Sequence, residues 1–185
     1  NRLVELIHYA PTTETVKATP VVIVTPWINK FYILDLNPQK SMVKHLTDQG
    51  FSVFITSWKN PDAEMAEVRF DDYLLEGVSE AVRVASEFCK QPKVHLVGYC
   101  IGGTLVSTYL AWANRRYGHD KVPVAHWTLF TTLTDFARWF RTTDMLLNVE
   151  IKNGPVIYEG IEERTLSVLD QFGILQAPKP VDGMR

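Results

Sequence analysis

Val94-His95-Leu96-Val97-Gly98-Tyr99-Cys100-Ile101-Gly102-Gly103-Thr104-Leu105 reads as a short apolar strand, a G-x-C-x-G-G turn and the start of a helix. Such a turn holds its central residue in a strained backbone conformation, and the flanking glycines remove the Cβ atoms that would collide there. The pattern is that of a nucleophile elbow with a cysteine at its centre. It predicts that Cys100 is the catalytic nucleophile and that the backbone N–H of Ile101 belongs to an oxyanion hole.

The alternative for Cys100 is a small buried hydrophobic residue at the end of a strand, a common environment for a free cysteine. Cys89, the other cysteine, fits that alternative better. It lies late in an amphipathic helical pattern and has no neighbouring glycine. We expect Cys89 to have no chemical role.

The composition is that of a globular chain with enough apolar residues for one core: 185 residues, 46% hydrophobic, 22% charged and a formal net charge of -2. The 19 Lys and Arg are scattered and no Cys/His spacing resembles a zinc site. A nucleic-acid partner, a metal and a cofactor are therefore not expected. The apolar stretches are too short to span a membrane, and a free elbow thiol favours a reducing cytoplasm.

Apolar runs alternate with amphipathic segments along the chain. Continuous β-branched runs are typical of strands buried on both faces of a parallel sheet, and helical spacing between a serine and a glycine predicts a capped helix. We expect strands at 3–9, 20–26, 51–58, 94–97 and 125–132 and helices at 41–49, 71–90 and 104–116. The fold class predicted is α/β of the α/β-hydrolase type, a mainly parallel sheet flanked by helices, with sites at the carboxyl ends of the strands.

This alternation of strands and helices stops after residue 136. We expect residues 1–136 to form a partial α/β-hydrolase catalytic domain, incomplete on its C-terminal side, and residues 137–185 to form a divergent tail. A cap element, a disordered extension and the product of a shifted reading frame all stay open for this tail.

An elbow cysteine also needs a second oxyanion donor. This donor is expected in the loop after the strand that ends at Pro26. We favour the N–H of Ile28 over those of its neighbours Trp27 and Asn29.

The base and the acid that would activate Cys100 follow the nucleophile along the chain in this fold. His119 and His126 are both expected at the opposite edge of the sheet, so neither is a credible base. Asp135 stands where some hydrolases place their acid, although capping of a turn is its simpler role. No base is identifiable from the sequence.

Four ordered motifs together carry a resemblance to a known family. They are Pro26-Trp27-Ile28-Asn29-Lys30-Phe31-Tyr32-Ile33-Leu34-Asp35-Leu36, Ser57-Trp58-Lys59-Asn60-Pro61-Asp62, Gly98-Tyr99-Cys100-Ile101-Gly102-Gly103-Thr104 and Thr131-Thr132-Leu133-Thr134-Asp135-Phe136. Over about residues 1–136 the chain resembles polyhydroxyalkanoate (poly-3-hydroxybutyrate) synthases, most closely the class I enzymes.

The resemblance implies a bacterial cytoplasmic acyltransferase. Such an enzyme polymerises (R)-3-hydroxyacyl-CoA, typically 3-hydroxybutyryl-CoA, into a storage polyester on granule surfaces and releases CoA. It implies that Cys100 is the acylated nucleophile and that the complete enzyme acts as a homodimer. Trp27, Asn29 and Tyr32 are candidates for contacts with the substrate, although aromatic residues at such positions more often belong to the core.

The family's catalytic aspartate and histidine lie downstream of these motifs, in a region that has no counterpart here. Its separate N-terminal region is expected to be absent as well. We therefore expect the isolated chain to be an inactive, truncated or frame-shifted form of a synthase. A cysteine-dependent α/β hydrolase of the dienelactone type and a non-catalytic remnant stay open as alternatives.

Overall fold

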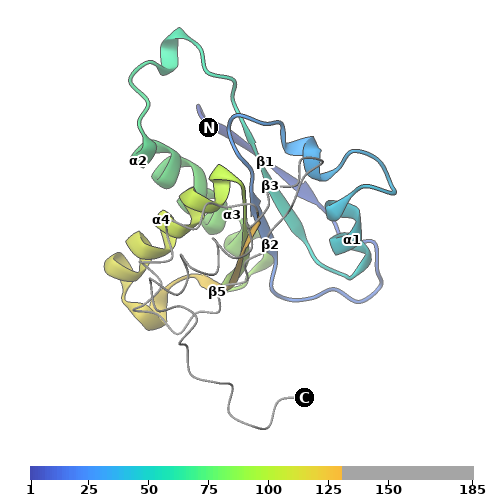
Figure 1. Ribbon diagram of the computed structural model, residues 1–185. Coiled ribbons are helices and arrows are strands. Elements are labelled where there is room, and N and C mark those ends of the chain that lie inside the picture. The colour runs from blue at the N-terminus through green and yellow to red at the C-terminus, as the bar shows by residue number, and fades with distance from the viewer. Residues whose placement is uncertain (131–185) are drawn as a thin grey trace, which may run out of the picture. The chain divides into compact units, whose positions relative to one another are not determined.

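The computed structural model describes residues 1–130, which form a five-stranded sheet with helices on both faces (Figure 1). The strands are β1 (Val4–Tyr9), β2 (Val21–Val24), β3 (Val53–Trp58), β4 (Val94–Tyr99) and β5 (Val124–Phe130). The helices are α1 (Met42–Asp48), α2 (Phe70–Asp72), α3 (Glu80–Cys89) and α4 (Ile101–Tyr117), with a π-helix η3 (Tyr73–Ser79) and 3-10 turns η1 (Phe31–Leu34), η2 (Ala63–Met65) and η4 (His119–Lys121). The strands predicted within these residues are confirmed, as are the helices predicted for 41–49 and 104–116. The tail predicted for 137–185 lies outside the described residues.

The strand order is β1-β3-β2-β4-β5. Strands β3, β2, β4 and β5 are parallel to one another, and only β1 runs antiparallel to its neighbour β3. The chain passes from β2 to β3 on one side and then crosses to β4 on the other side of β2. The carboxyl ends of β2 and β4 therefore flank the switch point of the sheet, where functional sites collect in α/β proteins.

Alternate residues of the central strands supply two separate cores. Val22 and Val24 of β2 pack on the side of α3 and α4, whereas Val21 and Ile23 pack on the side of α1. Figure 1 shows α2, α3 and α4 on one face of the sheet and α1 on the other. All four residues of β2 are buried, as the continuous β-branched run predicts.

Helix α1 has the predicted ends. The hydroxyl of Ser41 accepts a hydrogen bond from the Lys44 backbone N–H at 2.7 Å, so Ser41 is the N-cap. Gly50 follows the helix with a φ of 85°, a conformation that favours glycine.

The single helix predicted for 71–90 is interrupted by the π-helix η3 between α2 and α3. Gly77 in η3 lies directly against the indole ring of Trp58, because a Cβ atom on Gly77 would be 2.5 Å from a ring carbon. A π-helix is a wider turn, found mostly as a short insertion near functional sites. Here the widened turn and its glycine leave room for the ring at the end of β3.

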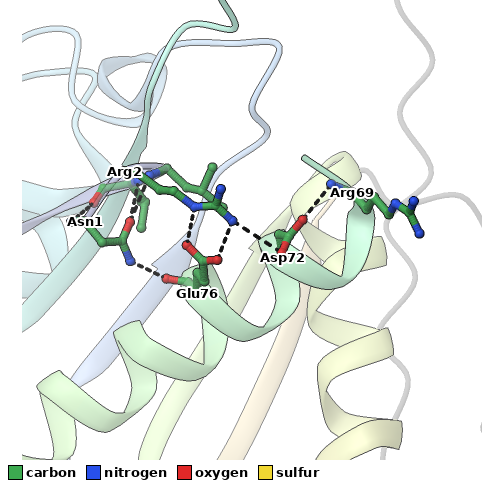
Figure 2. A network of polar contacts seen from close by, with 7 residues as sticks. Asn1, Arg2, Arg69, Asp72 and Glu76 are labelled. Carbon is green, nitrogen blue, oxygen red and sulfur yellow. Dashed lines mark hydrogen bonds and ion pairs between the residues drawn. The ribbon is translucent and has the colours of Figure 1, made fainter. Parts of the chain in front are cut away.

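The start of β1 is joined to these helical turns by a polar network (Figure 2). Arg2 donates to both carboxylate oxygens of Glu76, at 2.8 and 2.6 Å, and lies 3.5 Å from Asp72. Asp72 in turn accepts from the backbone N–H of Arg69 at 2.8 Å. Hydrogen bonds from Arg2 hold the pKa of Glu76 below its usual value. The bidentate geometry orients β1 against η3.

His95 of β4 and His126 of β5 face each other near the starts of their strands, with ring centroids 5.2 Å apart. Burial, with a smaller contribution from His126, lowers the pKa of His95. In the acidic range the unfolded chain therefore binds a proton at His95 more readily than the folded chain does. The folded state loses stability as the pH falls below the usual histidine pKa of about 6.5.

We expect the midpoint of urea unfolding to fall between about pH 7.5 and about pH 5.5 and the His95→Gln variant to show a smaller fall. His45→Gln, on the exposed side of α1, is the matched control and should keep the pH dependence of the unmodified chain. Urea titrations followed by circular dichroism measure the midpoints. The same fall in all three chains would contradict the role assigned to His95.

Candidate active site

Cys100 lies between β4 and α4 with φ 55° and ψ −128°. Among the non-glycine residues of 1–130, the only other one with a positive φ is Lys90. This conformation is costly for a residue with a Cβ atom, so the strained centre predicted for the turn is confirmed. The side chain of Cys100 is half-buried.

The glycines around Cys100 allow three backbone segments to touch. A Cβ atom on Gly98 would lie 2.5 Å from the Cα of Gly103, and one on Gly102 would lie 2.3 Å from the carbonyl oxygen of Val24. The first turn of α4 therefore packs directly on β4 and on the end of β2. No larger residue fits either position without moving backbone.

Backbone hydrogen bonds fix the turn itself. The N–H of Cys100 donates to the carbonyl of Phe130 at 2.8 Å, and the N–H of Gly103 donates to the carbonyl of Cys100 at 2.9 Å. Ile101 is the first residue of α4, so its N–H has no acceptor within the helix and lies at the positive end of the helix dipole. The residue after the cysteine thus supplies the kind of donor that an oxyanion requires.

The loop after β2 and the 3-10 turn η1 that follows it contain the other predicted site residues. Ile28 is 70% exposed on a turn, and Asn29 and Tyr32 are exposed as well. Trp27 is half-buried, and its ring lies 4.9 Å from that of Tyr73 and 6.4 Å from that of Trp58. Trp27 thus packs against aromatic side chains of β3 and η3.

All five histidines belong to the described part of the chain, and none lies at the carboxyl ends of the parallel strands. His119 is in η4, between the end of α4 and the start of β5. His95 and His126 lie near the starts of β4 and β5. His8 lies in β1, whose end meets the start of β3 because the pair is antiparallel. The positions predicted for His119 and His126 are confirmed, and Asp135 lies outside the described residues.

Cys89 ends helix α3, on the side of the sheet where the strands begin. Burial raises the pKa of the Cys89 thiol, with an opposing contribution from a hydrogen bond with Ser52. A raised pKa disfavours the thiolate, which is the reactive form. These features support an inert Cys89.

Within residues 1–130, no three His, Cys, Asp or Glu side chains gather closely enough to hold a metal ion. None of the helices described is long and apolar enough to cross a membrane.

Comparison with known proteins shows a similarity to one family of polymerases. A family model described as the N-terminus of poly-beta-hydroxybutyrate polymerase (PhaC) matches residues 1–46. The poly(3-hydroxyalkanoate) polymerase subunit PhaC of Cupriavidus necator is 47% identical over 137 residues, which are 74% of this chain and 23% of that protein. The polymerase of Methylorubrum extorquens is 46% identical over 136 residues, 74% of this chain and 22% of that protein. Over about 136 residues the chain is thus similar to part of the poly(3-hydroxyalkanoate) polymerases.

The chain spans less than a quarter of the length of these polymerases. The residues matched by the model of the polymerase N-terminus, 1–46, include β1, β2 and the start of α1. The aligned regions cover about three quarters of the chain. The family resemblance drawn from the four motifs is confirmed.

Solved structures confirm the fold. A probable hydrolytic enzyme from Pseudomonas aeruginosa PAO1 superimposes with a TM-score of 0.50 at 12% identity, over 70% of this chain and 37% of that one. A fungal esterase from Rhizomucor miehei superimposes with a TM-score of 0.51 at 21% identity, over 71% of this chain and 41% of that one. At these identities the likeness concerns the fold alone, which is the α/β-hydrolase type predicted from the sequence.

The strain at Cys100 predicts an unusual order of stability. The free energy of unfolding of Cys100→Gly, measured by urea titration, should exceed that of Cys100→Ala by about 1 kcal/mol. Relief of backbone strain contributes about 1–3 kcal/mol, which exceeds the entropic cost of glycine, about 0.5–1 kcal/mol. Arg115, exposed in α4, is the matched control, since glycine there should be less stable than alanine. If the glycine variant were less stable than the alanine variant at both positions, the strain assigned to Cys100 would be contradicted.

The contact between α4 and β2 predicts a large effect at Gly102. Gly102→Ala places a methyl group 2.3 Å from a backbone oxygen and should lower the free energy of unfolding by about 2–3 kcal/mol. Thr104→Ala, in the same turn of α4, adds no atom and serves as the control. Equal urea midpoints for the two variants would show that the turn can move away from β2.

Proposed function

We propose that this chain supplies the nucleophile and the oxyanion-binding region of a poly(3-hydroxyalkanoate) polymerase. The observation that carries the proposal is the strained Cys100 at the N-terminus of α4, in a chain 47% identical to such a polymerase over 137 residues. The substrate is (R)-3-hydroxyacyl-CoA, typically 3-hydroxybutyryl-CoA, and the product is a polyester.

In the first step the sulfur of Cys100 attacks the carbonyl carbon of the CoA thioester. The negative charge passes to the carbonyl oxygen, which accepts hydrogen bonds from the N–H of Ile101 and from the loop after β2, where Ile28 is the favoured donor. Collapse of this intermediate breaks the bond to the CoA sulfur, and CoA leaves as a thiolate that takes up a proton. Cys100 retains the acyl group as a thioester.

In the second step a hydroxyl group of another monomer or of the growing chain loses its proton and attacks the acyl carbon on Cys100. The ester bond forms as the bond to the Cys100 sulfur breaks, and the released thiolate takes up a proton. A histidine base would remove the proton from the thiol and then from the hydroxyl. The histidines of this chain lie away from the carboxyl edge, so we propose that the isolated chain accepts an acyl group slowly and forms no polymer. Asn29, exposed in the loop after β2, and Tyr32, exposed in η1, are candidates for contact with the substrate.

The setting proposed for the complete enzyme is that of the family: a homodimer at the surface of polyester granules in the bacterial cytoplasm. Sedimentation of the chain with and without purified granules tests both parts of this proposal.

The test of the first step uses the 185-residue chain and 3-hydroxybutyryl-CoA at about pH 9, where a free thiol is largely ionised without a base. We expect release of CoA and one acyl adduct per chain, mapped by mass spectrometry to the peptide that contains Cys100. Cys100→Ala should reduce both to the level without protein, and Cys89→Ala should leave both unchanged.

An adduct found equally on Cys89 would contradict the assignment of Cys100. Cleavage of simple esters that depends on Cys100, without transfer from the CoA thioester, would favour a hydrolase instead. A chain without either activity and with a broad unfolding transition would favour a non-catalytic remnant.

A further inference from the structure

Thr25, the residue after β2, is held by side chains of β3 rather than by the backbone ladder of the sheet. The pairing of β2 with β3 ends at Ile23 opposite Ile55. Beyond it, the N–H of Thr25 donates to the hydroxyl of Thr56 at 3.0 Å, and the hydroxyl of Thr25 donates to the carbonyl of Thr56 at 2.6 Å. Thr25 and Thr56 are both fully buried. At this point, hydrogen bonds that involve side-chain hydroxyl groups replace the backbone ladder between β2 and β3.

Trp58 completes this contact from the same strand. Its indole N–H donates to the carbonyl of Thr25 at 2.6 Å, and the residue is 8% exposed. The ring is seated on Gly77 of the π-helix η3. Both backbone polar groups of Thr25 therefore have buried side-chain partners. We call Thr25, Thr56 and Trp58 the Thr25 clasp.

The loop that follows the clasp is tied to the same neighbours. The ring of Trp27 packs on Tyr73 of η3 and on Trp58. The ammonium group of Lys30 donates to the side-chain oxygen of Asn60, just after β3. The loop after β2 and the segment after β3 thus lie side by side, although about thirty residues separate them along the chain.

The other side of β2 is fixed by the elbow. Gly102 at the start of α4 lies against the carbonyl of Val24, the residue before Thr25. Of two consecutive residues at the end of β2, Val24 therefore contacts the elbow helix and Thr25 belongs to the clasp. The loop of residues 26–29 begins immediately after this fixed point.

We propose that Thr56 and Trp58 are positioning residues, which hold the loop of residues 26–29 at the distance from Cys100 that oxyanion binding requires. The inference rests on the proposed function, in which this loop supplies the second donor to the oxyanion. Neither residue contacts the reacting atoms in this proposal. Their effect passes through Thr25, and a displacement of a donor by about 1 Å is enough to reduce a rate about 100-fold.

The variants separate the hydrogen bonds of the clasp from its packing. Thr56→Val removes the hydroxyl at nearly constant shape, and Thr56→Ser retains a hydroxyl. Trp58→Phe removes the indole N–H and keeps an aromatic ring. Ser57→Ala, between them on β3, is the matched control.

Three measurements are made on each full-length variant. The first is single-turnover acylation of Cys100 by 3-hydroxybutyryl-CoA over a range of concentrations. The second is alkylation of Cys100 by iodoacetamide, which needs the thiolate but no oxyanion hole. The third is hydrogen exchange in peptides that cover residues 24–30.

We expect Thr56→Val and Trp58→Phe to lower the maximal acylation rate about 10- to 100-fold. The substrate concentration that gives half of the maximal rate should stay within about twofold of that for the unmodified chain. Alkylation should be unchanged, and exchange in 24–30 should rise about tenfold. Thr56→Ser should recover most of the acylation rate. Ser57→Ala should match the unmodified chain in all three measurements.

The inference would be overturned if Thr56→Val and Trp58→Phe changed neither the hydrogen exchange of residues 24–30 nor the acylation rate. It would also be overturned if the acylation and alkylation rates fell equally, because that result indicates a damaged elbow. The proposed function fails separately if the unmodified chain shows no acylation that depends on Cys100. Hydrogen exchange decides about the clasp in that case: a tenfold rise supports it and an unchanged rate overturns it.

Discussion

The contact of helix α4 with strands β2 and β4 is the constraint on which the site depends. Gly102 touches the carbonyl of Val24, and Gly98 touches Gly103, at separations that exclude a Cβ atom. To turn from β4 into a helix packed this closely, the chain must reverse within one residue, and Cys100 takes the strained conformation that results. The same turn brings the first N–H groups of α4 beside the thiol. Packing, strain and the position of the donors thus have one common cause.

Much of this arrangement is predictable because its causes are local. The apolar run that ends at Val24 predicts a strand buried on both faces, and it has both cores of the protein on its two sides. Ser41 and Gly50 mark the ends of α1 through short-range hydrogen bonding and backbone conformation. The G-x-C-x-G-G pattern predicts the strain at Cys100 for the same reason, since all the atoms that collide lie within a few residues or in the neighbouring strand.

Features that depend on distant partners could not be predicted in this way. The antiparallel direction of β1 is a property of its pairing with β3, and the contact of Arg2 with Glu76 joins residues 74 positions apart. The π-helix in the middle of a regular amphipathic pattern reflects the ring of Trp58 resting on Gly77. The hydrogen bonds of Thr25 likewise join residues 31 and 33 positions apart. In the sequence, only the two motifs around Trp27 and Trp58 point to these hydrogen bonds. A family resemblance draws attention to those motifs, whereas hydrophobic periodicity does not.

The two steps of the proposed reaction place unequal demands on these elements. A cysteine thiolate is a strong nucleophile, so in the proposed reaction attack on a thioester needs little more than the elbow and its donors. Exchange of one thioester for another also retains the activation of the acyl group, which a serine ester would lose. A hydroxyl group is far less acidic than a thiol, and its attack on the acyl-enzyme requires a positioned base. In the proposed reaction, residues 1–130 therefore supply the groups for capture of an acyl group, and elongation of the polyester is the step that depends on a histidine at the carboxyl edge of the sheet.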